Sequence, residues 1–142
     1  MENPFEKITL ETIVNASIDK VWRSWSAPEH ITKWAQASPE WHAPHAENDL
    51  RTNGKFKTTM AAKDGSMQFD FEGVYTKVET NKLIEYQIAD GRNVKTVFSV
   101  DGKQTKVTQT FDAEKENPIE MQRGGWQSIL NSFKQYTEST TF

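Results

Sequence analysis

The sequence predicts an α+β fold: a curved antiparallel sheet, two short helices near its N-terminal end, and one long C-terminal helix across the concave face. Three observations lead to this prediction. Two helix-start signals directly follow one N-terminal strand, Asp-Gly pairs separate a series of alternating segments, and a third helix-start signal precedes the last apolar stripe. This order indicates a sheet that curves around a helix and encloses a cavity. A chain of 142 residues is of the size of one domain, which we expect to span residues 1–142.

The N-terminal part of the chain reads as one strand followed by two short helices. Residues 8–14 mostly alternate apolar and polar side chains, which is typical of a strand with one buried face. Ser17 precedes an apolar stripe with helical spacing, so its side chain can cap the first helix. Ser26 and Glu29 have the spacing of a capping box, and Pro28 suits the first turn of a second helix.

The centre of the chain predicts an antiparallel meander. Residues 35–53 are irregular and contain an extended segment, after which alternating apolar and polar positions continue to residue 111. Asp-Gly pairs favour tight hairpin turns between such segments. The pairs are Asp64-Gly65, Asp90-Gly91 and Asp101-Gly102. Most apolar side chains of residues 67–75 occupy odd-numbered positions, whereas Val78 beyond them occupies an even-numbered position, so we expect a bulge or a strong twist near Gly73.

The last predicted element is the long helix. Asn117 has the position of an N-cap, Pro118 that of the first helical residue, and Glu120 that of the third. Gly124 and Gly125 interrupt the helix, although each glycine costs about 1 kcal/mol relative to alanine. We expect the pair to open space between the helix and the sheet for a ligand. Close helix-to-sheet packing and a kink are the alternatives.

Composition excludes several classes of function. The formal net charge is −3, which gives no general attraction to nucleic acid or to anionic membranes, so we expect neither as a partner. The chain has no cysteine, which excludes disulfides, thiolate nucleophiles and cysteine-based zinc sites. The sequence contains no apolar run typical of a secretory signal or a membrane span, so we expect a cytoplasmic protein.

One cluster has side chains that bind metals. His42, His45, Glu47 and Asp49 lie close together in the sequence. Pro44 lies between the two histidines and disfavours their presentation on one helical face, so a solvated loop is the preferred interpretation. We therefore predict neither a metal site nor a cofactor.

No motif indicates catalysis. The sequence has no Gly-x-Ser-x-Gly elbow, no Ser–His–Asp order and no phosphate-binding loop, and we name no catalytic residue. Asp70 and Glu72 share a strand face that we expect to be solvated. Glu85 and Gln87 lie on one strand face and Gln109 on another. Whichever set faces inward would supply polar groups to an apolar pocket.

Several segments resemble one known superfamily along almost the whole chain. The matching segments are residues 16–22, 28–34 and 49–51 with Gly54 and Phe56, residues 71–75, and Gly125-Trp126 with Leu130 and Phe133. They are similar to motifs of the helix-grip (START and Bet v-like, or SRPBCC) superfamily, and within it to the branch named after the activator of heat-shock protein 90 ATPase. The resemblance implies the helix-grip fold.

The chain departs from the usual pattern of this branch at three positions. Ser17 stands where the family usually has proline, Ala35 where a second tryptophan is common, and Asn53 in place of the first glycine of a Gly-Gly pair. The alanine is expected to enlarge the space beside Trp34. The superfamily includes lipid carriers, hormone receptors and aromatase/cyclases, so the resemblance implies a fold more directly than an activity.

Large apolar side chains are the strongest signal for function. Core packing explains each of them singly, but in a helix-grip sheet the set favours a cavity for a ligand. Together with the two helix glycines, which we expect to open space, the candidate ligand-binding residues are Trp34, Phe56, Met60, Phe69, Phe71, Tyr75, Gly124, Gly125 and Trp126.

Two classes of function follow from these observations. The first is non-catalytic binding of a small hydrophobic or aromatic molecule. The second, implied by the family name, is a co-chaperone-like module that contacts a heat-shock protein 90 type ATPase in the stress response. The well-known activators carry a separate N-terminal region with no counterpart here, so we expect ligand binding first. A small cyclase or hydrolase is a further alternative, for which no set of residues argues.

Overall fold

The computed structural model describes residues 5–141, which form seven strands and three helices. The elements are β1 (Lys7–Val14), α1 (Ile18–Ser26), α2 (Pro28–Trp34), β2 (Trp41–Asn48), β3 (Lys55–Ala62), β4 (Gln68–Glu79), β5 (Leu83–Ile88), β6 (Asn93–Asp101), β7 (Gln104–Asp112) and α3 (Ile119–Ser139). The predicted α+β fold is confirmed. The prediction of one domain includes residues 1–4 and 142, which lie outside the described part, and it stays a prediction.

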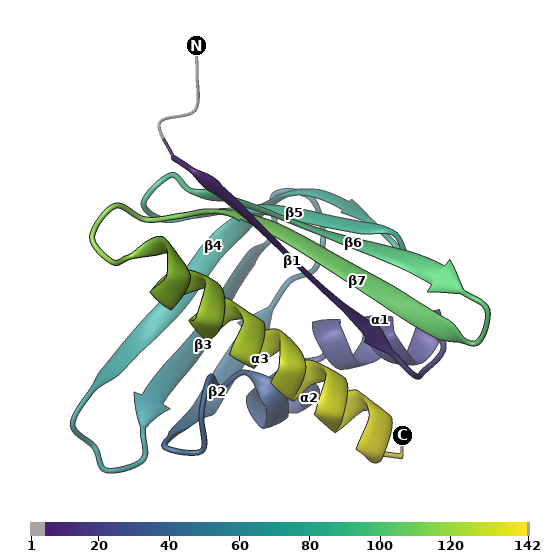
Figure 1. The fold of residues 1–142 in the computed structure, drawn as a ribbon, viewed down its shortest axis with the longest axis horizontal. Helices are drawn as coiled ribbons and strands as arrows, with labels where there is room; N and C mark the ends of the chain where they lie inside the picture. Colours follow the sequence, from purple (N-terminus) through teal and green to yellow (C-terminus); the bar gives the residue numbers. More distant parts are fainter. Residues whose placement is uncertain (1–4, 142) are drawn as a thin grey trace.

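All seven strands form one antiparallel sheet in the order β1-β7-β6-β5-β4-β3-β2. The sheet is curled into a half-barrel, and α3 lies across its concave face, while α1 and α2 lie near one end (Figure 1). The pairing of β1 with β7 brings the beginning of the chain beside its end. Consequently β1 and β2 are the two edge strands, and the helix pair connects them.

The turns and the first helix follow the sequence signals. The glycines of the three Asp-Gly pairs have positive φ angles of 79°, 97° and 63°, and each pair lies at a hairpin turn. Ser17 is the N-cap of α1, and its hydroxyl accepts a hydrogen bond of 3.3 Å from the Lys20 N–H. These local predictions are confirmed.

Two predicted caps are wrong. The N-cap of α2 is Ala27, because Ser26 still belongs to the last turn of α1 and its hydroxyl donates to the Trp22 carbonyl. The N-cap of α3 is Pro118, and the backbone and side-chain N–H groups of Asn117 donate to Glu114 instead. In both cases a local hydrogen bond takes the side chain that the cap required.

The structure gives exact positions for two features predicted in the strands. The extended segment expected within residues 35–53 is β2, whose register with β3 shifts between His42 and His45, around Pro44. The bulge expected near Gly73 lies two residues further along β4, between Tyr75 and Lys77. At Gly73 a Cβ would stand 2.5 Å from a carbonyl oxygen of β5, so that position requires glycine because the backbones approach closely.

Packing differs between the two halves of the sheet. The large side chains that are less than 2% exposed come from α1, α3, β1 and β5–β7. Every described residue of β2, β3 and β4 is at least 3% exposed. Helix α3 is tied to the β1 side, where Lys134 Nζ donates to the Ile13 carbonyl at 2.8 Å and the Asn15 N–H donates to Glu138 at 2.7 Å. The looser half therefore lies between α3 and β2–β4.

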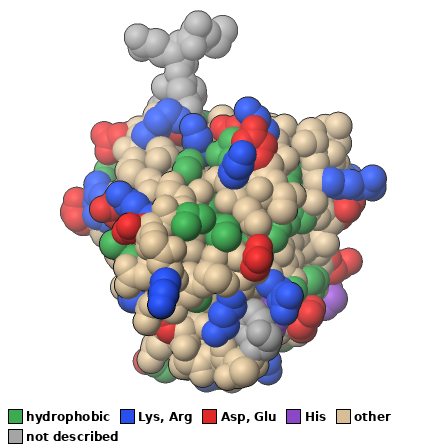
Figure 2. Space-filling model, turned by 90° about the vertical axis from the view of Figure 1, so that its right-hand side faces the viewer, with side chains coloured by type: hydrophobic (Ala, Val, Ile, Leu, Met, Phe, Trp, Pro, Cys, Tyr) green, Lys and Arg blue, Asp and Glu red, His purple; other side chains and the backbone are tan. Residues whose placement is uncertain are grey.

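The surface carries both charges. Figure 2 shows acidic and basic side chains interspersed on one face of the molecule, with small hydrophobic patches between them. No helix within residues 5–141 is long and apolar enough to cross a membrane.

Candidate functional site

A cavity of about 400 Å³ lies between α3 and the concave face of the sheet. Its walls come from α1, α2, α3 and the inner faces of β2–β5 and β7, and large apolar side chains predominate. The volume lies within the range of small-molecule pockets. The cavity occupies the looser half of the molecule, where α3 leaves the sheet uncovered.

Aromatic rings from three strands form the sheet wall. Phe56 of β3 is the centre of this group, with its ring centroid 4.7 Å from that of Tyr86 and 5.2 Å from that of Tyr75. Phe71 of β4 lies 5.7 Å from Phe56 and 6.2 Å from Tyr86. Edge-to-face and tilted contacts of this kind fix the ring orientations, so the wall is largely preformed.

Trp126 forms the opposite wall on α3. Its indole stacks on Phe111 of β7 with centroids 4.0 Å apart and planes 8° apart, and it meets Phe71 edge-on at 6.0 Å. Leu130, one turn further along α3, also lines the cavity. The stacked pair thus separates the cavity from the tightly packed half of the sheet.

A second aromatic group closes one end of the cavity. The Trp34 ring lies 5.1 Å from Trp25 and 5.0 Å from Phe133, and its Nε1–H donates to the Ser24 carbonyl at 2.8 Å. Ala35 follows on the cavity wall and is 3% exposed. The small side chain leaves free the space that we expected beside Trp34.

The other end is open to solvent. Phe69 of β4 is 47% exposed and Met121 of α3 is 65% exposed, and both line the cavity. Trp41 of β2 contacts Phe69 edge-on at 5.9 Å. This apolar rim gives a ligand a route to the interior.

Few polar groups reach the cavity, and most are paired. The Tyr75 hydroxyl donates to the Asn48 side-chain oxygen, and Asn48 Nδ2 donates to the Ser26 carbonyl at 2.6 Å. Gln109 is 5% exposed, and its Nε2 donates to Thr96 Oγ1 at 3.2 Å. Burial raises the pKa of Tyr75 well above its ordinary value, so its hydroxyl stays protonated.

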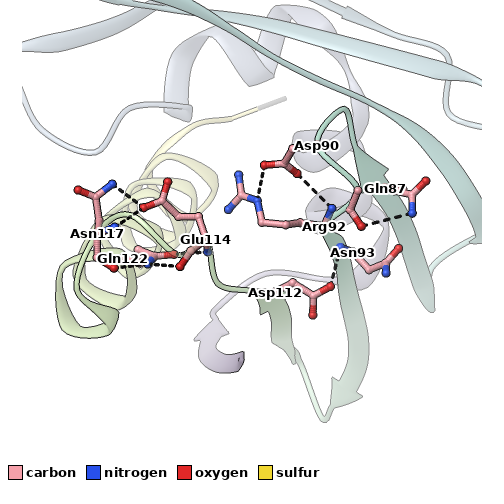
Figure 3. Close-up of polar contacts among 9 residues, drawn as sticks. Gln87, Asp90, Arg92, Asn93, Asp112, Glu114, Asn117 and Gln122 are labelled. Atoms are coloured by element: carbon pink, nitrogen blue, oxygen red, sulfur yellow. Dashed lines mark hydrogen bonds and ion pairs between the residues drawn. The ribbon is translucent and has the colours of Figure 1, made fainter. Parts of the chain in front are cut away.

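The loop between β7 and α3 and the turn between β5 and β6 contribute a polar end (Figure 3). Gln122 fixes the loop, because its Nε2 donates to the carbonyls of Glu114 and Asn117 and its Oε1 accepts from the Glu114 N–H. Arg92 is fixed by the turn, because its N–H and Nε–H both donate to the Asp90 carboxylate, at 3.1 and 2.8 Å.

Comparison with known proteins agrees with this architecture. Residues 15–138 match the family described as Activator of Hsp90 ATPase homolog 1-like protein. The chain belongs to this family. Among solved structures, an AHSA1-like protein from Aeromonas hydrophila is 38% identical, with a TM-score of 0.88 over 96% of this chain and 99% of that chain. A protein from Cytophaga hutchinsonii is 61% identical, with a TM-score of 0.81 over 93% of this chain and 92% of that chain.

More distant likeness concerns the fold alone. The Aha1 dimer from Colwellia psychrerythraea is 18% identical, with a TM-score of 0.73 over 94% of this chain and 97% of that chain. Comparison with curated proteins gave no match. The predicted family and the helix-grip fold are therefore confirmed, and the activity rests on the cavity itself.

In this AHSA1-like chain, seven of the nine candidate residues line one cavity. They are Trp34, Phe56, Met60, Phe69, Phe71, Tyr75 and Trp126. Gly124 and Gly125 are not on the wall, and a Cβ at either position would meet no atom within 4 Å. Close helix-to-sheet contact is thus not the reason for the glycine pair.

The predicted polar residues divide between the two faces of the sheet. Gln109 faces inward and lines the cavity, whereas Gln87 is exposed and Glu85 lies on the same outward strand face. Asp70 and Glu72 are exposed, as expected of a solvated strand face.

The histidine cluster forms pairs on the surface. His45 pairs with Glu47 at 3.1 Å and Asp49 with Arg51 at 2.9 Å, and all four side chains are more than half exposed. Within residues 5–141 no group of three His, Cys, Asp or Glu side chains has an arrangement that could hold a metal ion.

Sequence reasoning missed Tyr86 and Arg92. Tyr86 shares its strand face with the buried Ile84 and Ile88, and Arg92 lies two residues before the buried Val94. The alternation of buried and exposed positions therefore contained the signal for both residues, although Glu85 and Gln87, on the opposite face of β5, are the more conspicuous polar side chains.

Proposed function

We propose that this protein binds a small hydrophobic or aromatic molecule in the cavity between α3 and the sheet, without converting it chemically. The observation that carries the proposal is the cavity of about 400 Å³, walled by aromatic rings from both the sheet and α3. Each square ångström of apolar ligand surface removed from water stabilises the complex by about 25 cal/mol. A ring system that contacts Trp126 and Phe56 would gain most from this arrangement.

Binding rather than catalysis is supported by the state of the polar groups. Tyr75 is engaged with Asn48, and burial keeps its hydroxyl protonated, so it is poorly suited to act as a base. Glu47, which lies at the cavity wall, pairs with His45 at the exposed surface.

The experiment is a titration with N-phenyl-1-naphthylamine, an uncharged dye that brightens in apolar sites. We expect saturable binding of one dye per chain. Ala35→Trp, which adds an indole to the cavity wall, should weaken binding at least about tenfold, because the ring takes the ligand's space. The matched control is Ser99→Trp, at an exposed position of β6, which should bind the dye like the unmodified protein.

A second cavity-filling variant keeps the test decisive if Ala35→Trp does not fold. Thr58→Phe adds a ring to the cavity from β3, and circular dichroism verifies the fold of each variant. Dye binding that is unchanged in both folded filling variants would show that the dye binds elsewhere and would overturn the proposal.

A second function, stimulation of a heat-shock protein 90 type ATPase, is supported by the family match over residues 15–138. The test is the ATPase rate of the purified chaperone with and without this chain. Reproducible stimulation that survives Ala35→Trp would place co-chaperone activity ahead of ligand binding.

A further inference from the structure

One hydroxyl on the cavity wall makes no hydrogen bond to another described residue. Tyr86 is 8% exposed and projects from the inner face of β5 into the cavity wall. Within residues 5–141 its hydroxyl makes no hydrogen bond. Hydroxyl groups in protein interiors are normally paired, so this group, which the cavity leaves accessible, is available to a ligand. Burial also raises the pKa of Tyr86 far above its ordinary value, so the hydroxyl is a stable donor.

Arg92 offers further donors from the neighbouring strand end. Its side chain is 14% exposed and lines the cavity, and Asp90 engages only its Nε–H. Among the described residues, the four N–H bonds of Nη1 and Nη2 have no partner. The Nε–H bond to Asp90 holds the guanidinium, and the bond from the Arg92 backbone N–H holds the Asp90 carboxylate, so little ordering is required when a ligand binds.

The strand register brings these two groups to the same region. Tyr86 pairs with Val94 of β6, and Arg92 lies two residues before Val94, with its carbonyl accepting from the Ile88 N–H at 2.8 Å. Burial is the main cause of the raised pKa of Tyr86, and the charge of Arg92 acts on the same hydroxyl in the opposite direction.

The charges around the cavity select between an anionic and an uncharged ligand group. Asp90 already neutralises Arg92, and the other two charged residues of the wall, Glu47 and Glu114, are acidic. Figure 3 shows the Arg92 side chain in the space between Asp90 and Glu114. A carboxylate there would meet net negative charge, whereas a carbonyl oxygen accepts the same hydrogen bonds without that repulsion.

We propose that Tyr86 and Arg92 form a polar anchor for an uncharged carbonyl oxygen at one end of an otherwise apolar ring ligand. The carbonyl oxygen has two lone pairs and accepts one hydrogen bond from the Tyr86 hydroxyl and one from an Arg92 Nη. The ring body then lies against Trp126 and Phe71. This proposal rests on the proposed function and specifies the ligand class of the same cavity.

Three matched probes test it by displacing N-phenyl-1-naphthylamine. They are 2-acetonaphthone, 2-isopropenylnaphthalene, which has a CH₂ group in place of the ketone oxygen, and 2-naphthoate. We expect the ketone to bind at least about tenfold more tightly than the hydrocarbon, because the hydrocarbon leaves the Tyr86 and Arg92 donors unpaired. The naphthoate should bind more weakly than the ketone.

Variants assign the preference to the two residues. Tyr86→Phe and Arg92→Met should each weaken ketone binding several-fold or more and leave hydrocarbon binding within about twofold, since they keep the apolar wall. Arg51→Met is the matched control, because Arg51 makes the same kind of pair with the aspartate two residues before it but is 76% exposed and outside the cavity. Tyr136→Phe is the control for the hydroxyl.

The outcomes separate the two proposals. Equal affinity for ketone and hydrocarbon, with the dye still bound, overturns the anchor and leaves ligand binding in place. A ketone preference that persists in both Tyr86→Phe and Arg92→Met overturns the assignment to these residues. Tighter binding of the naphthoate overturns the uncharged class, and failure of the dye and all three probes to bind overturns both proposals.

Discussion

Two tyrosines of the cavity wall show how neighbouring residues take different roles. Tyr75 and Tyr86 both contact Phe56, but Tyr75 donates to Asn48 and so links β4 to β2, whereas the Tyr86 hydroxyl faces the cavity. Burial raises the pKa of both hydroxyls because a phenolate would lose its hydration. Burial thus keeps both hydroxyls protonated, but Tyr75 joins two strands whereas Tyr86 is available to bind a ligand.

These shifts predict alkaline destabilisation. In the unfolded chain a tyrosine ionises near its ordinary pKa of about 10, while Tyr75 and Tyr86 keep their protons in the fold. The folded state therefore binds more protons above about pH 10. The free energy of unfolding should be unaffected by these groups below that pH and fall by about 1.4 kcal/mol per tyrosine for each pH unit above it.

The measurement is urea unfolding across this pH range. Tyr75→Phe and Tyr86→Phe should each remove one tyrosine's contribution to the fall in the free energy of unfolding with pH. Tyrosinate absorbance from either residue in the folded protein near pH 11 would contradict the prediction.

Among single residues, the sequence predicted those whose large apolar side chain and position in a strand indicate which face of the sheet they occupy. Phe56, Phe71 and Tyr75 were predicted because large apolar side chains at alternating strand positions face a common interior. Arg92 was not predicted, because a charged residue beside a turn ordinarily faces solvent, whereas here its hydrogen bonds to Asp90 hold it against the cavity.

At the scale of elements, α3 presents a gap in its side-chain cover beside the cavity. Gly125 lies one turn from Met121 and Ile129, and both of these line the cavity. The open space at its Cβ position adjoins this wall, whereas Gly124 is exposed on the outer side of the helix. The glycine pair thus has one member beside the cavity and one away from it.

Substituting the two glycines should separate binding from stability. Gly125→Leu should weaken dye binding sharply, because the side chain extends along the cavity, while the free energy of unfolding changes little or rises by up to about 1 kcal/mol. Gly124→Leu should give the same gain in helix propensity without affecting dye affinity. Calorimetry and urea unfolding measure the two quantities. A loss of about 1–3 kcal/mol in Gly125→Leu would instead indicate overpacking.

Element boundaries were predictable where one cap had one partner. The Ser17 cap formed as expected, but Asn117 had a competing acceptor in Glu114, which no spacing rule reveals. The bounds of β2 within the expected extended segment were not predicted, because Pro44 and two histidines interrupt its alternation and its register with β3 shifts at that point.

At the scale of the whole molecule, stability and function are divided between two regions. β1, β7 and the inner face of α3 contain fully buried residues such as Ile8, Phe111 and Phe133, whereas β2–β4 surround the cavity and retain exposure. The order of elements predicted the sheet and the position of α3 across it. It did not predict this asymmetry, because the asymmetry depends on how closely α3 approaches β1.

Amide hydrogen exchange should reveal the division. We expect the slowest exchange in β1, β6 and β7, and faster exchange in β2–β4, where fewer buried contacts oppose local opening. Saturation with N-phenyl-1-naphthylamine should slow exchange mainly in β2–β4, because the bound dye fills the cavity that these strands surround. Uniform protection across the sheet, with or without dye, would contradict this view.

The contacts between α3 and β1 also bear on how copies of this protein behave when they meet. An open sheet offers the backbone of its outermost strands to other chains, which can add strands and aggregate. On the outer side of β1, Lys134 Nζ donates to the Ile13 carbonyl, and Arg123 Nη1 donates to the Thr9 carbonyl at 3.5 Å. A second molecule would have to displace the C-terminal helix before it could extend the sheet there. The helix that bounds the cavity thus also blocks edge-to-edge association of two molecules at β1.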